Sequence, residues 1–482
     1  MVYFCTMRIK VYSIITILFI SGSAKAQQKW TLPQCIAYAM SNNLTVKQTD
    51  LQSRISDLQY KQSKLSQYPN ASFSAGPSYN SGRNQDPTSF SLITQSYVSA
   101  NMQLQSSAEI FNWYSKRNTI AANYLEWQAT KANTDKLKND IALTVANSYL
   151  QILLSKEQEK IAGVQLQQSQ AQLKNTRKLV DAGALPELNA SELEVQVARD
   201  SATLISAKGS VDQSVLSLKA YMSIDAAAPF EIDEPPVEKI PVEKISDLQP
   251  DAVYALAMAN MPQQRVNNFK LKAAQKMSVA AKAGMYPTIS VYGSLASGFN
   301  SRAKEVTGLS QFTAPLGNVT IGPTTYNVFP LQPFTSYEYS KTAFLRQLNE
   351  NFRQSVGLSL SVPIFNGGNL RTGYERSKIN IQSLQLQKEL DDQKLKQDIY
   401  QAYNAAMVAL EKFNAGKKSL QTAERSFSFA QKRYDVGMLS TFELITNQKN
   451  LFRARLENTL NQFDYVFKMK VLEFYKGQGL KL

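Results

Sequence analysis

The sequence predicts an α+β membrane protein, in which four transmembrane β-strands are continued by a long α-helical coiled coil, with a two-fold internal repeat. Two long proline-free stretches, 88–185 and 364–482, are rich in Gln, Lys, Glu, Ala and Leu, which favour helix. Four short segments alternate apolar and small polar residues, a pattern typical of strands with one face in lipid and the other in water. Matching residues recur at constant offsets in the two halves.

The proline-free stretches predict helices that are much longer than the average helix of a globular protein. Helices of this length need a partner along their whole length, which indicates coiled-coil packing. The predicted helices cover 35–67, 113–181, 187–222, 251–284, 370–435 and 441–476. A heptad seam, with apolar residues mostly three and four apart, is formed by Ile399, Tyr403, Ala406, Leu410, Phe413, Leu420, Ala423, Phe427, Ala430 and Tyr434.

The four alternating segments predict strands at about 70–80, 95–107, 288–299 and 353–363. A half-buried sheet in a water-soluble protein gives the same alternation, so the pattern alone leaves both interpretations open. If the strands lie in a membrane, four of them cannot close a barrel, and the chain has to form an oligomer. Two copies would give eight strands with a filled interior, and three copies twelve strands around a water-filled lumen.

The repeat is visible as two offsets. At an offset of 218 residues, Ala37-x-Ala39-Met40 matches Ala255-x-Ala257-Met258. At 254 residues, Ile110-Phe111-Asn112 matches Ile364-Phe365-Asn366, and the register continues to Tyr221 and Tyr475. The change of offset indicates a 36-residue insertion in the second half, which predicts a long surface loop over about 300–351. The predicted divisions are a first repeat at 27–224, a Pro-rich linker at 225–250 and a second repeat at 251–482.

The N-terminus predicts a cleavable secretory signal peptide over residues 1–26. Arg8 and Lys10 precede an apolar stretch at 11–20, and Ala24-Lys25-Ala26 has the pattern of a cleavage site. Cleavage would remove Cys5 and leave Cys35 alone, so no intramolecular disulfide is expected. No cysteine follows the cleavage site directly, so we expect no lipid anchor there.

Composition excludes several classes of function. The chain has no histidine, which excludes histidine-based metal sites and Ser-His or Cys-His nucleophiles. It contains no Gly-rich phosphate loop, no recognisable pair of catalytic carboxylates and no metal-ligand spacing. The 53 Lys and Arg residues exceed the 38 Asp and Glu residues, but they are spread along helices, so no nucleic-acid partner is expected. We therefore predict no enzyme activity, no cofactor and no bound metal.

Three short motifs resemble the TolC-like outer membrane efflux protein family, and the resemblance covers essentially all of the sequence after the signal peptide. Tyr-Pro precedes the first strand of each half, at Tyr68-Pro69 and Tyr286-Pro287. Val-Pro-Ile-Phe-Asn-Gly-Gly at 362–368 joins the last strand to a long helix, and Asp-x-Gly-x-Leu occurs at 181–185 and at 435–439.

The resemblance implies a homotrimeric channel with a 12-stranded barrel in the lipid bilayer of a Gram-negative outer membrane and a helical tunnel in the periplasm. It also implies a passive exit duct for a tripartite efflux pump or a type I secretion system. The partners would be a periplasmic adaptor (membrane fusion) protein and an inner-membrane pump of the RND or ABC type. Adaptor contacts at the periplasmic helical tips would open the duct.

The family assigns roles to particular residues. Glu443 and Asn189 occupy the positions where a carboxylate often narrows the closed end, and Tyr434 that of a gating aromatic. A ring of three Glu443 carboxylates would attract cations, but the residue is equally explained as a first-turn helix carboxylate. Asn189 is explained by its place near a helix start, and Tyr434 by packing in the heptad seam.

The helical turns and the junctions complete the predicted site. The adaptor-docking tips are predicted to be Asp181, Gly183, Leu185, Asp435, Gly437 and Leu439, with positive φ at the two glycines. The helix–strand junctions are predicted at Pro69, Pro287, Pro363, Gly367 and Gly368. The first-half counterpart of the last junction, 108–114, lacks both the proline and the glycine pair, so a stiffer or differently angled junction is expected there.

Two other classes of function compete with a channel. An exported structural coiled-coil protein, such as a periplasmic spacer or stalk, would use the strands as a soluble sheet. A secreted enzyme is disfavoured because the sequence lacks catalytic motifs. The sequence names neither the exported substrate nor the choice between drug efflux and protein secretion.

Overall fold

The computed structural model describes residues 29–85, 90–237 and 240–477. The predicted signal peptide lies outside these residues. The chain divides into two compact units. The described residues within Met1–Leu58, Tyr124–Ala273 and Asn380–Leu482 form the helical unit, and those within Gln59–Asn123 and Ala274–Ile379 form the strand unit. Each unit draws on both sequence repeats, so the compact units do not coincide with the repeats.

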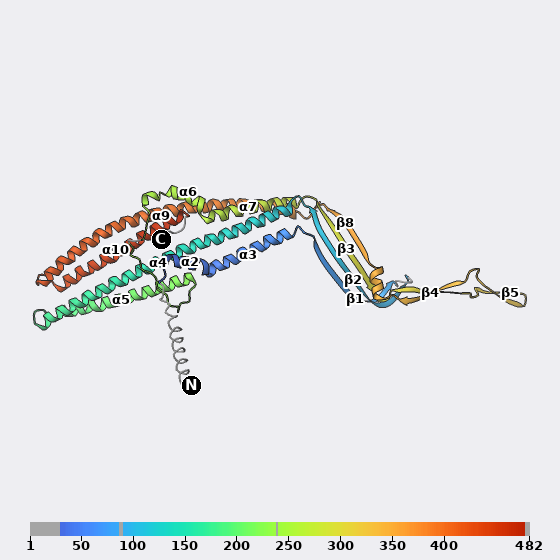
Figure 1. Cartoon of the computed structure of the whole chain (residues 1–482), viewed down its shortest axis with the longest axis horizontal. Coiled ribbons are helices and arrows are strands. Elements are labelled where there is room, and N and C mark those ends of the chain that lie inside the picture. Colours follow the sequence, from blue (N-terminus) through green and yellow to red (C-terminus); the bar gives the residue numbers. More distant parts are fainter. Residues whose placement is uncertain (1–28, 86–89, 238–239, 478–482) are drawn as a thin grey trace, which may run out of the picture. The chain divides into compact units, whose positions relative to one another are not determined.

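Two long helical hairpins dominate the helical unit (Figure 1). The first consists of α4 (Ser115–Asp181) and α5 (Glu187–Met222), and the second of α9 (Asn369–Asp435) and α10 (Thr441–Tyr475). Every residue of the predicted heptad seam on α9 is buried or partly buried, so the seam is confirmed. Among the described residues, no helix is both long enough and apolar enough to cross a bilayer.

The two shorter predicted helices are each split in two, which corrects the prediction. Residues 35–67 form α2 (Leu32–Asn42) and α3 (Leu44–Leu65), and residues 251–284 form α6 (Pro250–Asn260) and α7 (Pro262–Ala283). The first break is fixed by a capping side chain, because Asn43 Oδ1 accepts hydrogen bonds from the N–H groups of Thr45 and Val46. The second lies at Pro262, which has no N–H to continue a helix.

Two apolar clusters form the core of the helical unit. One joins α2, α4, α5 and the linker through residues such as Tyr149, Leu218 and Ile232. The other joins α6, α9 and α10 through residues such as Ile399 and Met469. The described part of the linker includes a 3-10 turn, η2 (Ile245–Asp247), and a β-bridge between Trp30 and Ile232.

The strand unit contains a four-stranded antiparallel sheet in the order β1-β2-β3-β8. Its strands are β1 (Asn70–Gln85), β2 (Leu92–Phe111), β3 (Thr288–Asn300) and β8 (Arg353–Ser361). The first two strands extend beyond the predicted 70–80 and 95–107. Among the described residues β1 and β8 each pair on one side only, so the sheet has two open edges.

The register separates an apolar face from a polar face. Phe73, Leu104 and Leu295 lie directly across from one another, and Val291 lies opposite Leu358. The other face carries small polar residues, and hydroxyls of opposite strands hydrogen-bond across it. Two such pairs are Ser78–Ser99 and Ser294–Ser355, each with 2.8 Å between the oxygens. Much of the apolar face is exposed in the single chain.

The segment predicted as a surface loop over about 300–351 is mostly regular structure, which corrects that prediction. It contains two antiparallel pairs, β4 with β7 and β5 with β6, and the short helix α8. Their bounds are β4 (Lys304–Phe312), β5 (Gly317–Ile321), β6 (Thr324–Val328), β7 (Phe334–Lys341) and α8 (Phe344–Glu350). The β-branched and aromatic residues that alternate here favour strand, and Gly322, with φ +61°, turns β5 into β6.

The helix–strand junctions of the two halves have positive φ at the same two repeat positions despite their different sequences. Gly367 and Gly368 precede α9 with φ of 66° and 78°. At the repeat positions, Trp113 and Tyr114 have φ of 52° and 62°, an arrangement that costs L-residues about 1–2 kcal/mol each. Trp113 is held by a 2.8 Å hydrogen bond from its Nε1 to the Pro287 carbonyl. The first junction thus has two positive φ values without glycine, and a stiffer or differently angled junction stays a prediction.

The predicted prolines lie at element ends. Pro69 and Pro287 directly precede β1 and β3, and Pro363 follows β8 by two residues. A proline at the start of a strand removes no hydrogen bond from the ladder.

Candidate functional site

The turns at the tips of the two hairpins share one backbone design. In the first, the Gly183 N–H donates to the Val180 carbonyl and the Ala184 N–H to the Leu179 carbonyl, both at 2.8 Å. In the second, the Gly437 N–H donates to the Tyr434 carbonyl at 2.9 Å. Both glycines have positive φ, 76° and 72°. This is the Schellman arrangement that ends helices, so the predicted positive φ is confirmed.

The apolar surface at the tips is made by residues that the sequence analysis missed. The predicted contacts Leu185 and Leu439 are partly buried, whereas Asp181 and Asp435 are exposed. The exposed apolar side chains are Leu188, Val436, Met438 and Phe442, at 65–70% exposure. The repeat offset could have pointed to two of them, because Leu188 and Phe442 occupy equivalent positions.

The carboxylate of Glu443 takes part in a capping box at the start of α10. Glu443 Oε2 accepts hydrogen bonds from Ser440 N–H at 3.1 Å and from Ser440 Oγ at 3.0 Å. Ser440 Oγ accepts in return from Glu443 N–H at 3.2 Å. The hydrogen bonds from Ser440 hold the pKa of Glu443 below its usual value of 4.5. This side chain is exposed, so it stays charged at neutral pH and caps its own helix.

Asn189, the equivalent residue in the first repeat, is partly buried. Its N–H donates to the Pro186 carbonyl at 3.1 Å. Pro186 precedes α5 and offers no capping side chain. The two equivalent positions therefore differ in charge and in local role.

Tyr434 connects three helices near the tips. Its hydroxyl lies 3.0 Å from Thr176 Oγ1 on α4 and 3.4 Å from Thr441 Oγ1 on α10. Both threonines are buried, and Tyr434 itself is partly buried. Tyr434 thus does more than pack in the seam: it joins the second hairpin to the first through its hydroxyl.

A buried polar layer that the sequence did not predict joins α4, α5 and α10. Ser169 Oγ donates to Asp200 Oδ2 at 2.5 Å, and Gln196 Nε2 donates to Asp200 Oδ1 at 2.7 Å. Gln448 Nε2 of α10 reaches Ser169 Oγ at 3.2 Å. All four side chains are less than one tenth exposed. The layer is a second polar connection between the two hairpins.

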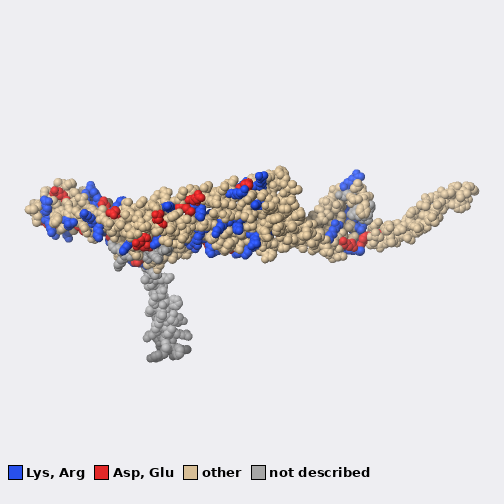
Figure 2. Space-filling view, turned by 90° about the horizontal axis from the view of Figure 1, so that it is seen from above, with Lys and Arg blue, Asp and Glu red and all other residues tan. Residues whose placement is uncertain are grey.

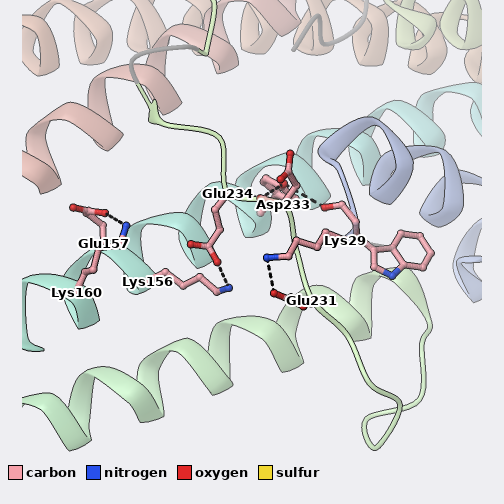
Figure 3. Close-up of polar contacts among 9 residues, drawn as sticks. Lys29, Lys156, Glu157, Lys160, Glu231, Asp233 and Glu234 are labelled. Carbon is pink, nitrogen blue, oxygen red and sulfur yellow. Dashed lines mark hydrogen bonds and ion pairs between the residues drawn. The ribbon is translucent and has the colours of Figure 1, made fainter. Parts of the chain in front are cut away.

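A charged cluster ties the linker to α4 and to the segment before α2 (Figure 3). Lys29 pairs with Glu231 at 2.7 Å, and Lys156 with Glu234 at 2.5 Å. The Glu231 carboxylate raises the pKa of Lys29 through a hydrogen bond and its charge. Between these pairs, Tyr149 donates its hydroxyl to the Asp233 carbonyl at 2.5 Å. These contacts hold the linker against the helices.

Side chains at equivalent repeat positions near the ends of α5 and α10 hydrogen-bond to the backbone of the linker. Lys219 is buried, and its Nζ donates to the carbonyls of Ala226 at 2.5 Å and Ala228 at 2.6 Å. At the equivalent position Glu473 accepts from the Glu243 N–H at 2.8 Å. The same place in the repeat thus holds a cation in one half and an anion in the other.

The described residues form no candidate metal site, and their one cysteine is not reactive. Within residues 29–85, 90–237 and 240–477, no three His, Cys, Asp or Glu side chains gather as a metal site. Cys35 is fully buried, and burial raises the pKa of its thiol to about 12. A thiol with such a pKa is unreactive at neutral pH.

The fold and the repeated hairpins define a class of protein, and comparison with known sequences names it. The family model of the outer membrane efflux proteins matches residues 36–223 and 253–466. The chain belongs to this family, as its motifs predicted.

Relatives with assigned names are distant. The chain is 22% identical over 453 residues to the probable efflux pump outer membrane protein TtgC of Pseudomonas putida, covering 90% of this chain and 81% of TtgC. It is 26% identical over 136 residues to the outer membrane protein TolC of Escherichia coli, covering 27% of this chain. That match spans only 28% of TolC, and the match to OpmQ of Pseudomonas aeruginosa spans 64% of OpmQ.

Solved structures share the fold. The chain aligns with CusC at a TM-score of 0.75 and 16% identity, covering 95% of this chain and 96% of CusC. It aligns with VceC of Vibrio cholerae at a TM-score of 0.71 and 14% identity, covering 93% and 97%. CusC is described as forming a transmembrane channel, and VceC as an outer membrane protein.

Proposed function

We propose that this protein is a passive outer-membrane channel, a homotrimer whose twelve strands form one barrel and whose helices form a periplasmic tunnel. The observation that carries the proposal is the four-stranded sheet, with one apolar face, one polar face and two edges left open among the described residues. Unpaired strand edges are not tolerated in lipid. Pairing of β8 of one copy with β1 of the next satisfies both edges and closes a barrel with a polar lumen.

In this proposal the channel is the exit duct of a tripartite efflux pump or a type I secretion system. Family membership favours it over an exported spacer or stalk. An inner-membrane pump of the RND or ABC type supplies the energy, because the sequence offers no nucleotide-binding motif. The predicted signal peptide, 1–26, would direct export, and the absence of a lipid anchor stays a prediction.

The test is extraction followed by reconstitution. The protein should resist high salt and carbonate, need detergent for release, and have the mass of three chains once the bound detergent is subtracted. It should give discrete single-channel currents in planar bilayers. A stalk protein would wash off in carbonate, and recovery of a single-copy protein without lipid affinity would overturn the channel.

The adaptor is proposed to bind the exposed apolar side chains at the tips. Met438 and Phe442 lie on the second tip and Leu188 on the first. Met438→Asp with Phe442→Asp should abolish adaptor co-purification after mild crosslinking and leave the trimer intact. Leu216→Asp, an exposed apolar position on α5 far along the chain from the tips, is the matched control. Equal crosslinking yields in both variants would refute the assignment.

Glu443 is proposed to contribute to a cation-attracting constriction in addition to capping α10. Three copies would bring three carboxylates around the axis, and charged rings of this kind set ion selectivity. Glu443→Ala should reduce cation selectivity or raise single-channel conductance. Ser440→Ala weakens the cap but keeps the charge, so it separates the two roles. Selectivity and conductance that stay at wild-type values in Glu443→Ala would leave only the capping role.

A further inference from the structure

The inserted segment of the second repeat contains a long stretch without charge. From Val306 to Tyr337 there is no Asp, Glu, Lys or Arg, in a chain with 19% charged residues and a net charge of +15. We name residues 304–341, which comprise β4 to β7, the ribbon. Figure 2 shows charged side chains at the base of the ribbon and none along the rest of its visible face. A surface that stays in contact with water usually carries charged side chains, so solubility does not explain this uncharged surface.

Both strand pairs of the ribbon are amphipathic. In the pair of β4 with β7, Val306 lies opposite Tyr339 and Leu309 opposite Tyr337. A bulge between Val306 and Gly308 keeps Val306 and Leu309 on the same face. The opposite face of this pair carries Gly308, Ser310, Ser336 and Glu338, and at its far end Phe312 opposite Phe334. Gln311 and Thr335 are the polar residues at that end of the Leu309 face.

The pair of β5 with β6 also has an apolar face and a polar face. Val319 lies opposite Tyr326 on one face, while Asn318 and Thr320 lie opposite Asn327 and Thr325 on the other. The apolar side chains of both pairs are exposed in the single chain, for example Leu309 at 67% and Tyr337 at 52%. Each strand pair of the ribbon therefore has a face with apolar side chains that stay exposed in the described part of the single chain.

The base of the ribbon is firmly attached to the sheet. Gln347 of α8 is buried, accepts from the Asn300 N–H at 2.9 Å and donates to the Thr342 carbonyl at 2.9 Å. Arg346 pairs with Glu305 at 2.5 Å. Because β3 begins just after α7 and ends at the ribbon, the ribbon lies at the end of the strands opposite to α7.

The open edges identify the kind of partner. Among the described residues each ribbon pair has two strands only, and such pairs are marginally stable alone in water. The outer edges of these strands have no neighbouring strand in that part of the chain, and no Lys or other charged side chain protects them from 306 to 337. Lipid chains could cover an apolar face, but they cannot bond to a strand edge. A second ribbon can cover the apolar face and can also form backbone hydrogen bonds with the strand edge.

Identical copies of this protein all carry the same positive charge, and an uncharged ribbon lets them approach without repulsion. We propose that in the trimer the ribbons of neighbouring copies pack with their apolar faces together, as one β-structure at the outer mouth of the barrel. This inference rests on the proposed trimeric channel, which places the three ribbons around one rim. The occupant of the apolar face is thus a second copy of this chain.

Cysteine crosslinking tests the contact. Tyr337→Cys places a thiol on the apolar face, and Ser336→Cys places one on the polar face at the neighbouring position. Leu309→Cys and Ser310→Cys form a second matched pair on β4. The native Cys35 is fully buried, so the unmodified protein gives the background. We expect a short bis-maleimide to give covalent dimers with at least tenfold greater yield from the apolar-face thiols than from the polar-face thiols.

The mass and the conductance of the purified protein distinguish failure of the ribbon contact from failure of the channel proposal. If the protein has the mass of a trimer and conducts, but the apolar-face and polar-face thiols crosslink equally or not at all, the ribbon contact is wrong and the channel stands. If the protein has the mass of one chain, the channel proposal fails and the ribbon contact fails with it. A solvent-sensitive fluorophore can also be attached to the thiol of the Tyr337→Cys variant. Emission that shifts to the blue only after transfer into lipid vesicles, without crosslinking, would assign the face to lipid and overturn the contact.

Discussion

Replacement of Tyr434 by Phe removes one hydroxyl and should loosen the connection between the two hairpins. The hydroxyl contacts Thr176 Oγ1 at 3.0 Å and Thr441 Oγ1 at 3.4 Å, and these threonines are only 1% and 2% exposed. A buried neutral hydrogen bond contributes about 1 kcal/mol to stability. In the proposed trimer three copies act together, which gives about 3 kcal/mol. Because about 1.4 kcal/mol corresponds to a factor of ten, the closed state should lose about a hundredfold of its preference.

Single-channel recording in planar bilayers measures this shift as an increase in open probability. Tyr400→Phe is the matched control, since its hydroxyl donates to Asp251 Oδ1 at 2.8 Å on the same helix α9 but outside the tips. That variant should keep the wild-type open probability. If Tyr434→Phe unfolds at the wild-type temperature and opens no more often than Tyr400→Phe, the hydroxyl does not hold the tunnel closed.

Three further predictions concern stability, measured by thermal unfolding of the detergent-purified protein. Hydrogen bonds in the capping box lower the pKa of Glu443 in the folded protein, so the carboxylate contributes to stability above its usual pKa of 4.5, and this contribution is lost as the pH falls below that value. The difference in Tm between wild type and Glu443→Ala should therefore close between neutral and strongly acidic pH, and a constant difference would contradict this. Gly437→Ala should cost about 1–2 kcal/mol because φ is +72°, whereas Gly209→Ala in the open interior of α5 should be neutral or stabilising. Lys219→Met should cost about 1–3 kcal/mol because the buried Lys219 ammonium no longer donates to the carbonyls of Ala226 and Ala228, and a wild-type Tm would show that the linker is held elsewhere.

Most of the helical architecture could be predicted from the sequence. The predicted helix 187–222 has the observed bounds of α5, and the heptad seam on α9 is buried or partly buried along its length. These features depend on residues a few positions apart, such as the apolar period and the glycine at each turn. The same reasoning failed at Asn43, where one side chain starts a new helix within an otherwise helical pattern.

The strands were harder to predict where the sequence also looks like a loop. Gly, Pro and Thr between 306 and 337 indicated an irregular segment, but cross-strand pairing between β4 and β7 outweighs those signals. The positive φ at Trp113 and Tyr114 was not predicted for a different reason. Neither residue favours positive φ, yet the hydrogen bond from Trp113 to the Pro287 carbonyl and the ring contact with Tyr286 stabilise that conformation.

The candidate site shows the same division. Sequence motifs located both tips and drew attention to Glu443 and Tyr434, because the turns and the repeat register are written locally in the chain. The partners were decided by tertiary structure: Thr176 and Tyr434 are 258 residues apart, and the Ser169–Gln448 contact joins residues 279 apart. A single sequence carries no local signal for such pairs. The periodicity and the turn residues are thus determined by the sequence alone, whereas the polar connections between the hairpins and the exposure of Met438 in place of Leu439 follow only from how the helices pack.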